Sequence, residues 1–247
     1  MNKRQSQILE WINTEKKIEV SSLAERLDVS QVTIRKDLDL LEGNGLIKRS
    51  HGFATSGNPD DLENRLALHY PLKRQIAILA AASVKDGETV MIESGSTCAL
   101  LAKELTLKKD ITIITNSAFI ASYLKDAPQT KIILLGGEYQ HKSQVTIGTL
   151  VKQAATNFRV DKLFVGVDGF SAGFGFTGSD LMRADTVRSM AESAAEVFVL
   201  TESKKFEQTG TVSLFPLKAV SRVYTDDRIR EAMLKVLTDA GIMVATV

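Results

Sequence analysis

From about residue 72 onward, short apolar segments alternate with segments whose apolar residues recur at helical spacing, such as Ile76, Leu79, Ala80 and Val84. Strand candidates lie at residues 89–93, 111–115, 131–135, 162–167 and 197–201, with weaker ones at 222–225 and 243–245. Strands that are separated by helices favour a largely parallel sheet, because the helix provides the crossover that parallel pairing needs. This half of the chain therefore predicts an α/β domain with a Rossmann-like, mostly parallel sheet.

Small and polar residues follow the carboxyl ends of these predicted strands, which is the edge where parallel sheets bind ligands. Residues 94–97, Ser-Gly-Ser-Thr, precede a predicted helix through Leu101 and Leu105. Free amides, hydroxyls and the positive end of a helix dipole suit a phosphate, although such a turn often only caps a helix. Further polar segments lie at 115–117, 136–137, 168–169 and 202–205. Several polar loops on one rim predict a ligand pocket.

Near the amino terminus, residues 27–38 predict a turn followed by a helix over 31–42. Ser30 is a favoured N-cap, and Ile34, Leu38 and Leu41 fall on one buried stripe of that helix. The positions away from the stripe or on its flanks are Val32, Thr33, Arg35 and Lys36. The outer face of the helix thus presents a methyl group, a hydroxyl and two cations.

Another short helix is expected just upstream, because Ser22 and Glu25 have capping-box spacing and Leu23 with Leu27 supplies a buried side. Together the two helices predict a helix-turn-helix at about 20–39. An earlier amphipathic helix would cover the same core with Ile8, Leu9, Trp11 and Ile12. Residues 45–54 alternate around a His-Gly pair, which predicts a small hairpin, the wing of a winged helix.

Placement of charge distinguishes a DNA-binding module from a small helical subdomain with a solvated outer face. Residues 1–57 contain nine Lys or Arg against eight Asp or Glu, so their net charge decides nothing. The cations that gather on the predicted helix and wing are Arg35, Lys36, Lys48 and Arg49, with His51 beside them. This local basic face favours DNA as the partner.

The same residues carry a resemblance to the DeoR family of bacterial transcriptional regulators. They are Val29, Ser30, residues 33–38, Leu41, Glu42, Gly45, Leu46, Arg49 and residues 51–54. Lys36 and Phe53 depart from the family pattern, which usually has Arg and Gly there. The resemblance implies that Ser30, Gln31, Val32, Thr33, Arg35, Lys36, Lys48, Arg49 and His51 contact DNA, with Gln31, Val32, Arg35 and Lys36 at base edges or phosphates.

The resemblance extends over the second half, where the family has a sensor domain similar to the ribose-5-phosphate isomerase and CoA-transferase folds. It implies a phosphorylated sugar or related effector, with its phosphate at residues 93–97 and the rest of it contacting Asn116, Asp168 and Lys205. The full implied set is Glu93, Ser94, Gly95, Ser96, Thr97, Asn116, Ser117, Gly136, Gly137, Asp168 and Lys205. Departures from the family pattern are Glu93 and Glu202 in place of Asp, Met182 and Arg183 in place of acidic residues, and Val187 in place of Lys.

Length and composition fit this two-part organisation: a DNA-binding domain at 1–57, a linker at 58–70 and an effector-sensing domain at 71–247. The chain of 247 residues is 44% hydrophobic and 25% charged, which is ordinary for a globular protein. It shows no apolar run of membrane-spanning length and no signal-peptide core, so a cytoplasmic location is expected. Because Cys98 is the one cysteine, no internal disulfide framework is expected. The scattered His51, His69 and His141 predict no metal site, and no cofactor is expected.

The sequence therefore predicts a non-enzymatic DNA-binding regulator, a homo-oligomer (dimer or tetramer) that represses a sugar operon in response to a phosphorylated metabolite. Two alternatives remain open. One is a sugar-phosphate isomerase-like enzyme with an appended helical module, whose acid-base candidates include Glu93, Asp168, Glu202, Lys204 and Lys205. The other is a chain whose amino-terminal helices are a protein-protein adaptor, which would lack salt-dependent DNA binding.

Overall fold

The chain divides into two units, Met1–Pro71 and Leu72–Val247. The structure is a computed structural model, and it describes residues 3–43, 46–50, 52–55 and 62–247. Helix α4 (Leu62–Ala67) occupies part of the range predicted to be linker. Its Leu62 and Leu66 lie on one helical face and are both buried, which explains why this stretch is helical.

Three helices of the first unit share one small apolar core: α1 (Lys3–Glu15), α2 (Val20–Arg26) and α3 (Gln31–Gly43). Residues 27–30 join α2 to α3, so the predicted helix-turn-helix is confirmed. The fully or nearly fully buried side chains of this core include Ile8, Leu9, Ile12, Leu23, Ile34, Leu38 and Leu41. Helical periodicity alone identified most of these positions, because each helix buries a single stripe.

The predicted wing is also confirmed, as an antiparallel pair of β2 (Lys48–Ser50) and β3 (Phe53–Thr55). A strand that the sequence did not predict, β1 (Lys17–Glu19), pairs with the other edge of β3. The predicted capping box is wrong: α2 begins at Val20 with Glu19 at its N-cap, so Ser22 lies inside the helix. The physical reason is that β1 leads directly into α2, whose first amide, on Val20, donates to the Gly52 carbonyl at 3.0 Å.

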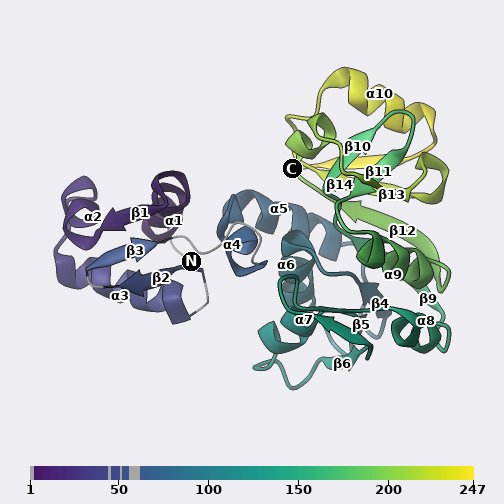
Figure 1. Cartoon of the computed structure of the whole chain (residues 1–247), viewed down its shortest axis with the longest axis horizontal. Coiled ribbons are helices and arrows are strands. Elements are labelled where there is room, and N and C mark those ends of the chain that lie inside the picture. Colours follow the sequence, from purple (N-terminus) through teal and green to yellow (C-terminus); the bar gives the residue numbers. More distant parts are fainter. Residues whose placement is uncertain (1–2, 44–45, 51, 56–61) are drawn as a thin grey trace. The chain divides into compact units, whose positions relative to one another are not determined.

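In the second unit, all seven predicted strands form one sheet (Figure 1). Its order is β15-β14-β12-β9-β4-β5-β6, and every neighbouring pair is parallel. The strands are β4 (Thr89–Ile92), β5 (Thr112–Thr115), β6 (Lys131–Leu134), β9 (Val160–Val165), β12 (Ala194–Leu200), β14 (Arg222–Thr225) and β15 (Met243–Thr246). The predicted α/β fold class is thus confirmed. Chain order runs outward from β4 in one direction and from β9 in the other.

Helices follow most of these strands and cover the sheet (Figure 1). They are α5 (Tyr70–Ala81), α6 (Ser96–Leu105), α7 (Ala118–Tyr123), α8 (Thr149–Ala155), α9 (Leu181–Ala191) and α10 (Glu231–Asp239). Helix α6 packs against α7, and α8 packs against α9. Crossover connections between parallel strands are right-handed, so connections that run toward opposite edges of the sheet place their helices on opposite faces. Both faces of the sheet are therefore covered, which is why its central strands are apolar on both sides. None of the helices in the described residues combines the length and the apolar character needed to cross a bilayer.

Two small antiparallel sheets, which the sequence did not predict, extend from the main sheet. One contains β10 (Gly169–Ser171), β11 (Gly175–Gly178) and β13 (Val212–Phe215), and the other pairs β7 (Glu138–Gln140) with β8 (Val145–Ile147). Short 3-10 turns, η1 (Ser203–Glu207) and η2 (Leu217–Ala219), flank β13. Strands of three or four residues show too few alternations to be recognised, and they form here because distant segments supply their partners.

Candidate DNA-binding and effector sites

Helix α3 begins at a capped turn and presents its outer face to solvent. The Ser30 hydroxyl accepts from the Thr33 amide at 3.2 Å, and the Ser30 carbonyl accepts from the Ile34 amide at 3.1 Å. With Ile34 and Leu38 fully buried, the exposed residues of the first two turns are Gln31, Val32, Arg35 and Lys36. Val32, an apolar residue, is 61% exposed, so its side chain is available to a partner.

Lys48 and Arg49, the two cations of β2, differ in exposure and in ion pairing. Lys48 is exposed, whereas the Arg49 guanidinium forms an ion pair with Asp39 of α3. The Arg49 amide also donates to the Glu42 carboxylate at 2.9 Å. Arg49 therefore ties β2 to α3, a positioning role that the sequence did not reveal. The predicted DNA contact at His51 lies outside the described residues.

Phe53, which departs from the family pattern, has a packing role in the wing. The Lys17 ammonium lies 3.9 Å from the centroid of the Phe53 ring, so a cation–π contact joins β1 to β3. A hollow between α3 and the wing is lined by Val20, Arg35, Glu42, Arg49, Ser50, Gly52 and Phe53. Among its lining residues that the structure describes, Arg35 is the exposed cation, since Arg49 is paired with Asp39. The Arg35 side chain thus lies between helix and wing.

A buried carboxylate anchors α3 to α1. Asp37 is only 4% exposed, and it accepts from the Arg4 Nε at 2.5 Å and from the Gln5 Nε2 at 2.9 Å. From the sequence, Asp37 belonged only to residues 33–38, which carry the family resemblance. Its true partners are more than thirty residues away in the chain, so no local pattern could identify them.

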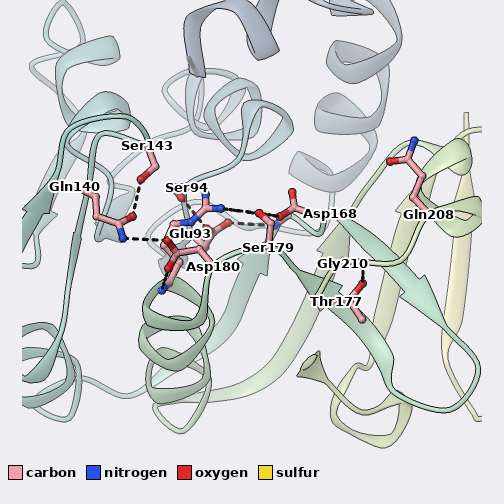
Figure 2. A network of polar contacts seen from close by, with 12 residues as sticks. Glu93, Ser94, Gln140, Ser143, Asp168, Thr177, Ser179, Asp180, Gln208 and Gly210 are labelled. Atoms are coloured by element: carbon pink, nitrogen blue, oxygen red, sulfur yellow. Dashed lines mark hydrogen bonds and ion pairs between the residues drawn. The ribbon is translucent and has the colours of Figure 1, made fainter. Parts of the chain in front are cut away.

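In the second unit, the strand order reverses between β4 and β9, and such a switch point opens a crevice at the carboxyl ends of the strands. Glu93, directly after β4, accepts from the Ser94 hydroxyl at 2.7 Å and from the Gly166 amide at 3.3 Å. Gly95 approaches Gly166 so closely that a Cβ on Gly95 would lie 3.5 Å from the Gly166 Cα. The loop after β4 therefore touches the loop after β9, and Figure 2 shows Glu93 and Ser94 within one polar network.

The start of α6 has the features of an anion site. Gly95 is the N-cap and provides no capping side chain. Ser96 and Thr97 are each 6% exposed, and in the part of the chain that the structure describes no group hydrogen-bonds to their hydroxyls. The first amides of a helix have no partner within it, so amides and hydroxyls together can donate to a phosphate.

A second set of polar groups lies beside this loop, from the residues that follow β9 and β11 and from β7 (Figure 2). Asp168 accepts from the Ser179 hydroxyl at 2.7 Å, and Ser179 accepts in turn from the Arg183 Nη2 at 3.1 Å. Asp180 caps α9 through the Arg183 amide at 2.9 Å and accepts from the Gln140 Nε2 at 3.1 Å. Burial opposes ionisation of Asp180, but these hydrogen bonds outweigh it and hold the pKa of its carboxyl below the usual value.

Four other residues of the implied effector set lie after β5 and β6, where the structure gives most of them packing roles. The Asn116 amide donates to the Thr146 carbonyl at 3.0 Å, and Ser117 is fully buried as the N-cap of α7. Gly136 is exposed. A Cβ on Gly137 would come within 2.6 Å of the Ile147 carbonyl oxygen, so this glycine permits a close approach to β8.

At the end of β12 the structure contains a buried ion pair that the sequence did not reveal. The Lys73 ammonium of α5 lies 3.6 Å from the Glu202 Oε1, and both side chains are less than one-tenth exposed. Lys205, in η1 just beyond Glu202, is half-buried and donates to Gln208 at 3.4 Å. Asp226, at the end of β14, accepts from the amide and the hydroxyl of Ser203 at 2.7 and 2.8 Å. Polar groups thus line four neighbouring strand ends.

Metal ligands do not gather anywhere in the described residues: no group of three or more His, Cys, Asp or Glu side chains there could hold an ion. Cys98 is buried in the first turns of α6.

A capped, exposed helix beside a wing, together with a parallel sheet that has donors at its switch point, defines a DNA-binding regulator with a sensor unit. Two family models match the chain: the DeoR-like helix-turn-helix domain over residues 4–59 and the DeoR C terminal sensor domain over residues 68–227. The chain belongs to the DeoR family of transcriptional regulators.

Curated relatives are similar over almost their whole length. The HTH-type transcriptional regulator GolR of Listeria innocua is 31% identical over 98% of this chain and 96% of its own. The lactose phosphotransferase system repressor of Lactococcus lactis is 31% identical over 93% of each chain. Among solved structures, a ribose 5-phosphate isomerase A from Methanocaldococcus jannaschii is similar over 56% of this chain and 55% of its own, with 20% identity and a TM-score of 0.41.

Proposed function

We propose that this protein represses a sugar or carbohydrate catabolic operon and is released or modulated by a phosphorylated sugar metabolite. The observation that carries the proposal is the capped helix α3, whose exposed face presents a methyl group and cations beside a wing. The lactose system repressor among the relatives supports an operon of this class. Because the partner is operator DNA, we place the protein in the cytoplasm.

On the DNA side, α3 lies in the major groove in this proposal. Gln31, Val32, Arg35 and Lys36 contact base edges or phosphates; Val32 suits a thymine methyl, and Arg35 suits guanine or phosphate. Ser30 and Thr33 also contact DNA, and Lys48, Arg49 and His51 reach the adjacent DNA backbone. Since Arg49 is also paired with Asp39, its contribution is smaller than that of the exposed Lys48.

On the effector side, the amides and hydroxyls of residues 94–97 hold the phosphate, and Asp168 and Lys205 contact the rest of the ligand. Glu93 orders this loop through Ser94 and Gly166. The neighbouring strand ends are shaped by Asn116, Ser117, Gly136 and Gly137.

One module buries little surface on DNA, so we propose a dimer or tetramer that binds repeated half-sites. Ligand binding then changes DNA affinity through a coupling on the order of 1 to 3 kcal/mol.

The Arg35→Ala variant is expected to lose about 1 to 3 kcal/mol of specific DNA binding, because it removes an exposed contact from the centre of the α3 face. The measurement is a titration of genomic fragments selected by the wild-type protein, at two salt concentrations. Lys125→Ala is the matched control, since it removes one exposed positive charge from the second unit and leaves affinity unchanged. Equal binding by Arg35→Ala and wild type would contradict the assignment of α3, and binding without salt dependence would favour a protein-protein adaptor.

The Ser96→Asp variant is expected to keep operator binding but to lose the response to phosphorylated sugars, with at least tenfold weaker ligand binding. A carboxylate at the start of α6 occupies and repels the proposed phosphate position. The readouts are operator affinity and the ligand-induced rise in melting temperature with a panel of sugar phosphates. Ser122→Asp on α7 adds the same charge at an exposed position and serves as the control. A response that survives in Ser96→Asp would mean that the phosphate binds elsewhere.

The enzymatic alternative predicts turnover of the same sugar phosphates. We expect none, because Glu93 is engaged by Ser94 and Gly166 and Asp168 by Ser179, so neither carboxylate is presented alone as a base. An isomerase assay at the ligand concentrations that raise the melting temperature separates the two functions.

A further inference from the structure

Arg183 contributes a cation to the crevice beside the proposed effector site. It lies in the first turn of α9, and its side chain is 20% exposed. Its Nη2 donates to the Ser179 hydroxyl at 3.1 Å and lies 4.0 Å from the Asp168 Oδ2. The Ser179 hydroxyl in turn donates a hydrogen bond to the Asp168 carboxylate at 2.7 Å. The guanidinium is thus held in place from one side.

Among the residues that the structure describes, most of the donors on this guanidinium have no protein acceptor at hydrogen-bond distance. An arginine side chain has five N–H donors in a fixed planar arrangement. Within the described ranges, the Ser179 hydroxyl is the acceptor that Arg183 reaches at hydrogen-bond distance, and the Asp168 carboxylate is beyond it. The Arg183 side chain is 20% exposed, so its remaining donors are available to an acceptor that arrives with a ligand.

The segment after β9 links Arg183 to the start of α6. Gly95 at the N-cap of α6 packs against Gly166, and Asp168 follows two residues later. Two extended residues span at most about 7 Å. The loop at the start of α6 and the Arg183 guanidinium therefore lie beside two nearby points of the segment after β9, Gly166 and Asp168.

Resting on the proposed function, we infer that Arg183 determines effector specificity and that the effector carries a second anionic group at the end remote from its phosphate. A planar guanidinium binds a carboxylate or a phosphate through two parallel hydrogen bonds, which a neutral hydroxyl cannot match. The ligand class is a phosphorylated sugar acid or a sugar bisphosphate. Asp168 holds Arg183 in place and accepts from a ligand hydroxyl.

The test compares matched ligand pairs on the full-length protein by titration calorimetry. The pairs are 6-phosphogluconate with glucose 6-phosphate, and fructose 1,6-bisphosphate with fructose 6-phosphate. In the wild type, we expect the doubly anionic member of at least one pair to bind at least tenfold more tightly. The pair that shows the preference identifies the second group as carboxylate or phosphate.

Arg183→Gln is expected to abolish this preference while the affinity for the monophosphate changes less than threefold, and Arg183→Lys is expected to restore part of it. Arg188→Gln, on the same helix, makes the same charge change and is expected to keep the preference.

Equal binding within both pairs by the wild type overturns the inference, and so does a preference that persists in Arg183→Gln. An equal loss for both members in Arg183→Gln would assign Arg183 a purely structural role. If none of these ligands binds, the sensor half of the proposed function fails, and the inference fails with it.

Discussion

The Glu202→Gln variant is expected to lower the free energy of unfolding of the second unit by about 3 to 5 kcal/mol, because it removes a buried charge from a buried partner. The Lys73 ammonium and the Glu202 carboxylate lie 3.6 Å apart, and both side chains are less than one-tenth exposed. In the variant, the buried Lys73 ammonium still carries the cost of its desolvation but no longer gains the attraction of this carboxylate. Unfolding in urea, followed by far-ultraviolet circular dichroism, measures the loss.

The control for this variant is Glu207→Gln in the same turn. Glu207 is half exposed and pairs with the exposed Arg230, so its removal is expected to cost less than about 1 kcal/mol. The double variant Lys73→Met with Glu202→Leu is expected to recover most of the stability, since a buried ion pair is often replaceable by apolar side chains of similar volume. A Glu202→Gln protein as stable as Glu207→Gln would show that the pair does not stabilise the fold.

The Asp37→Ala variant is expected to destabilise the first unit by roughly 3 kcal/mol, because two hydrogen bonds to a buried carboxylate are lost together. Asp37 accepts from Arg4 and Gln5 and thereby anchors α3 to α1. Trp11 in α1 is the only tryptophan of the chain, so its fluorescence in urea reports on this unit specifically.

Asp39→Ala is the matched control for Asp37→Ala. The Asp39 side chain is 64% exposed and pairs with Arg49, and its removal is expected to cost less than about 1 kcal/mol. Specific DNA binding should fall with Asp37→Ala at temperatures where the first unit is partly unfolded, and recover on cooling. A Trp11 transition that is the same in Asp37→Ala and Asp39→Ala would contradict the anchoring role.

Local patterns predicted helix α3 well. Ser30 caps α3 because the cap hydroxyl and the amide that it accepts from are three residues apart. Val32 is exposed and Ile34 is buried because a single helix has a fixed angular period. The capping box at Ser22 was wrong because a long-range bond from Val20 to Gly52 starts the helix earlier.

Partners that are distant in the chain were not predictable. Arg49 had been assigned only to DNA, but Asp39 holds it; Lys73 was not singled out, although it faces Glu202 across the sensor unit. The polar loop after β4 was predicted as a phosphate site. That it meets the loop after β9, which carries Asp168, and that Arg183 of α9 lies beside Asp168, could be seen only in the tertiary structure.

The sequence by itself determined helices α1, α2 and α3, the buried parallel strands of the main sheet, and which helix presents cations and methyl groups outward. These properties depend on periodicity and capping, which act over a few residues. Only the tertiary structure decided the strand order, the buried pairs of Asp37 and Lys73, and the position of Arg183 in the crevice. Those features depend on which segments meet after folding, and burial energy, rather than local preference, selects the partners.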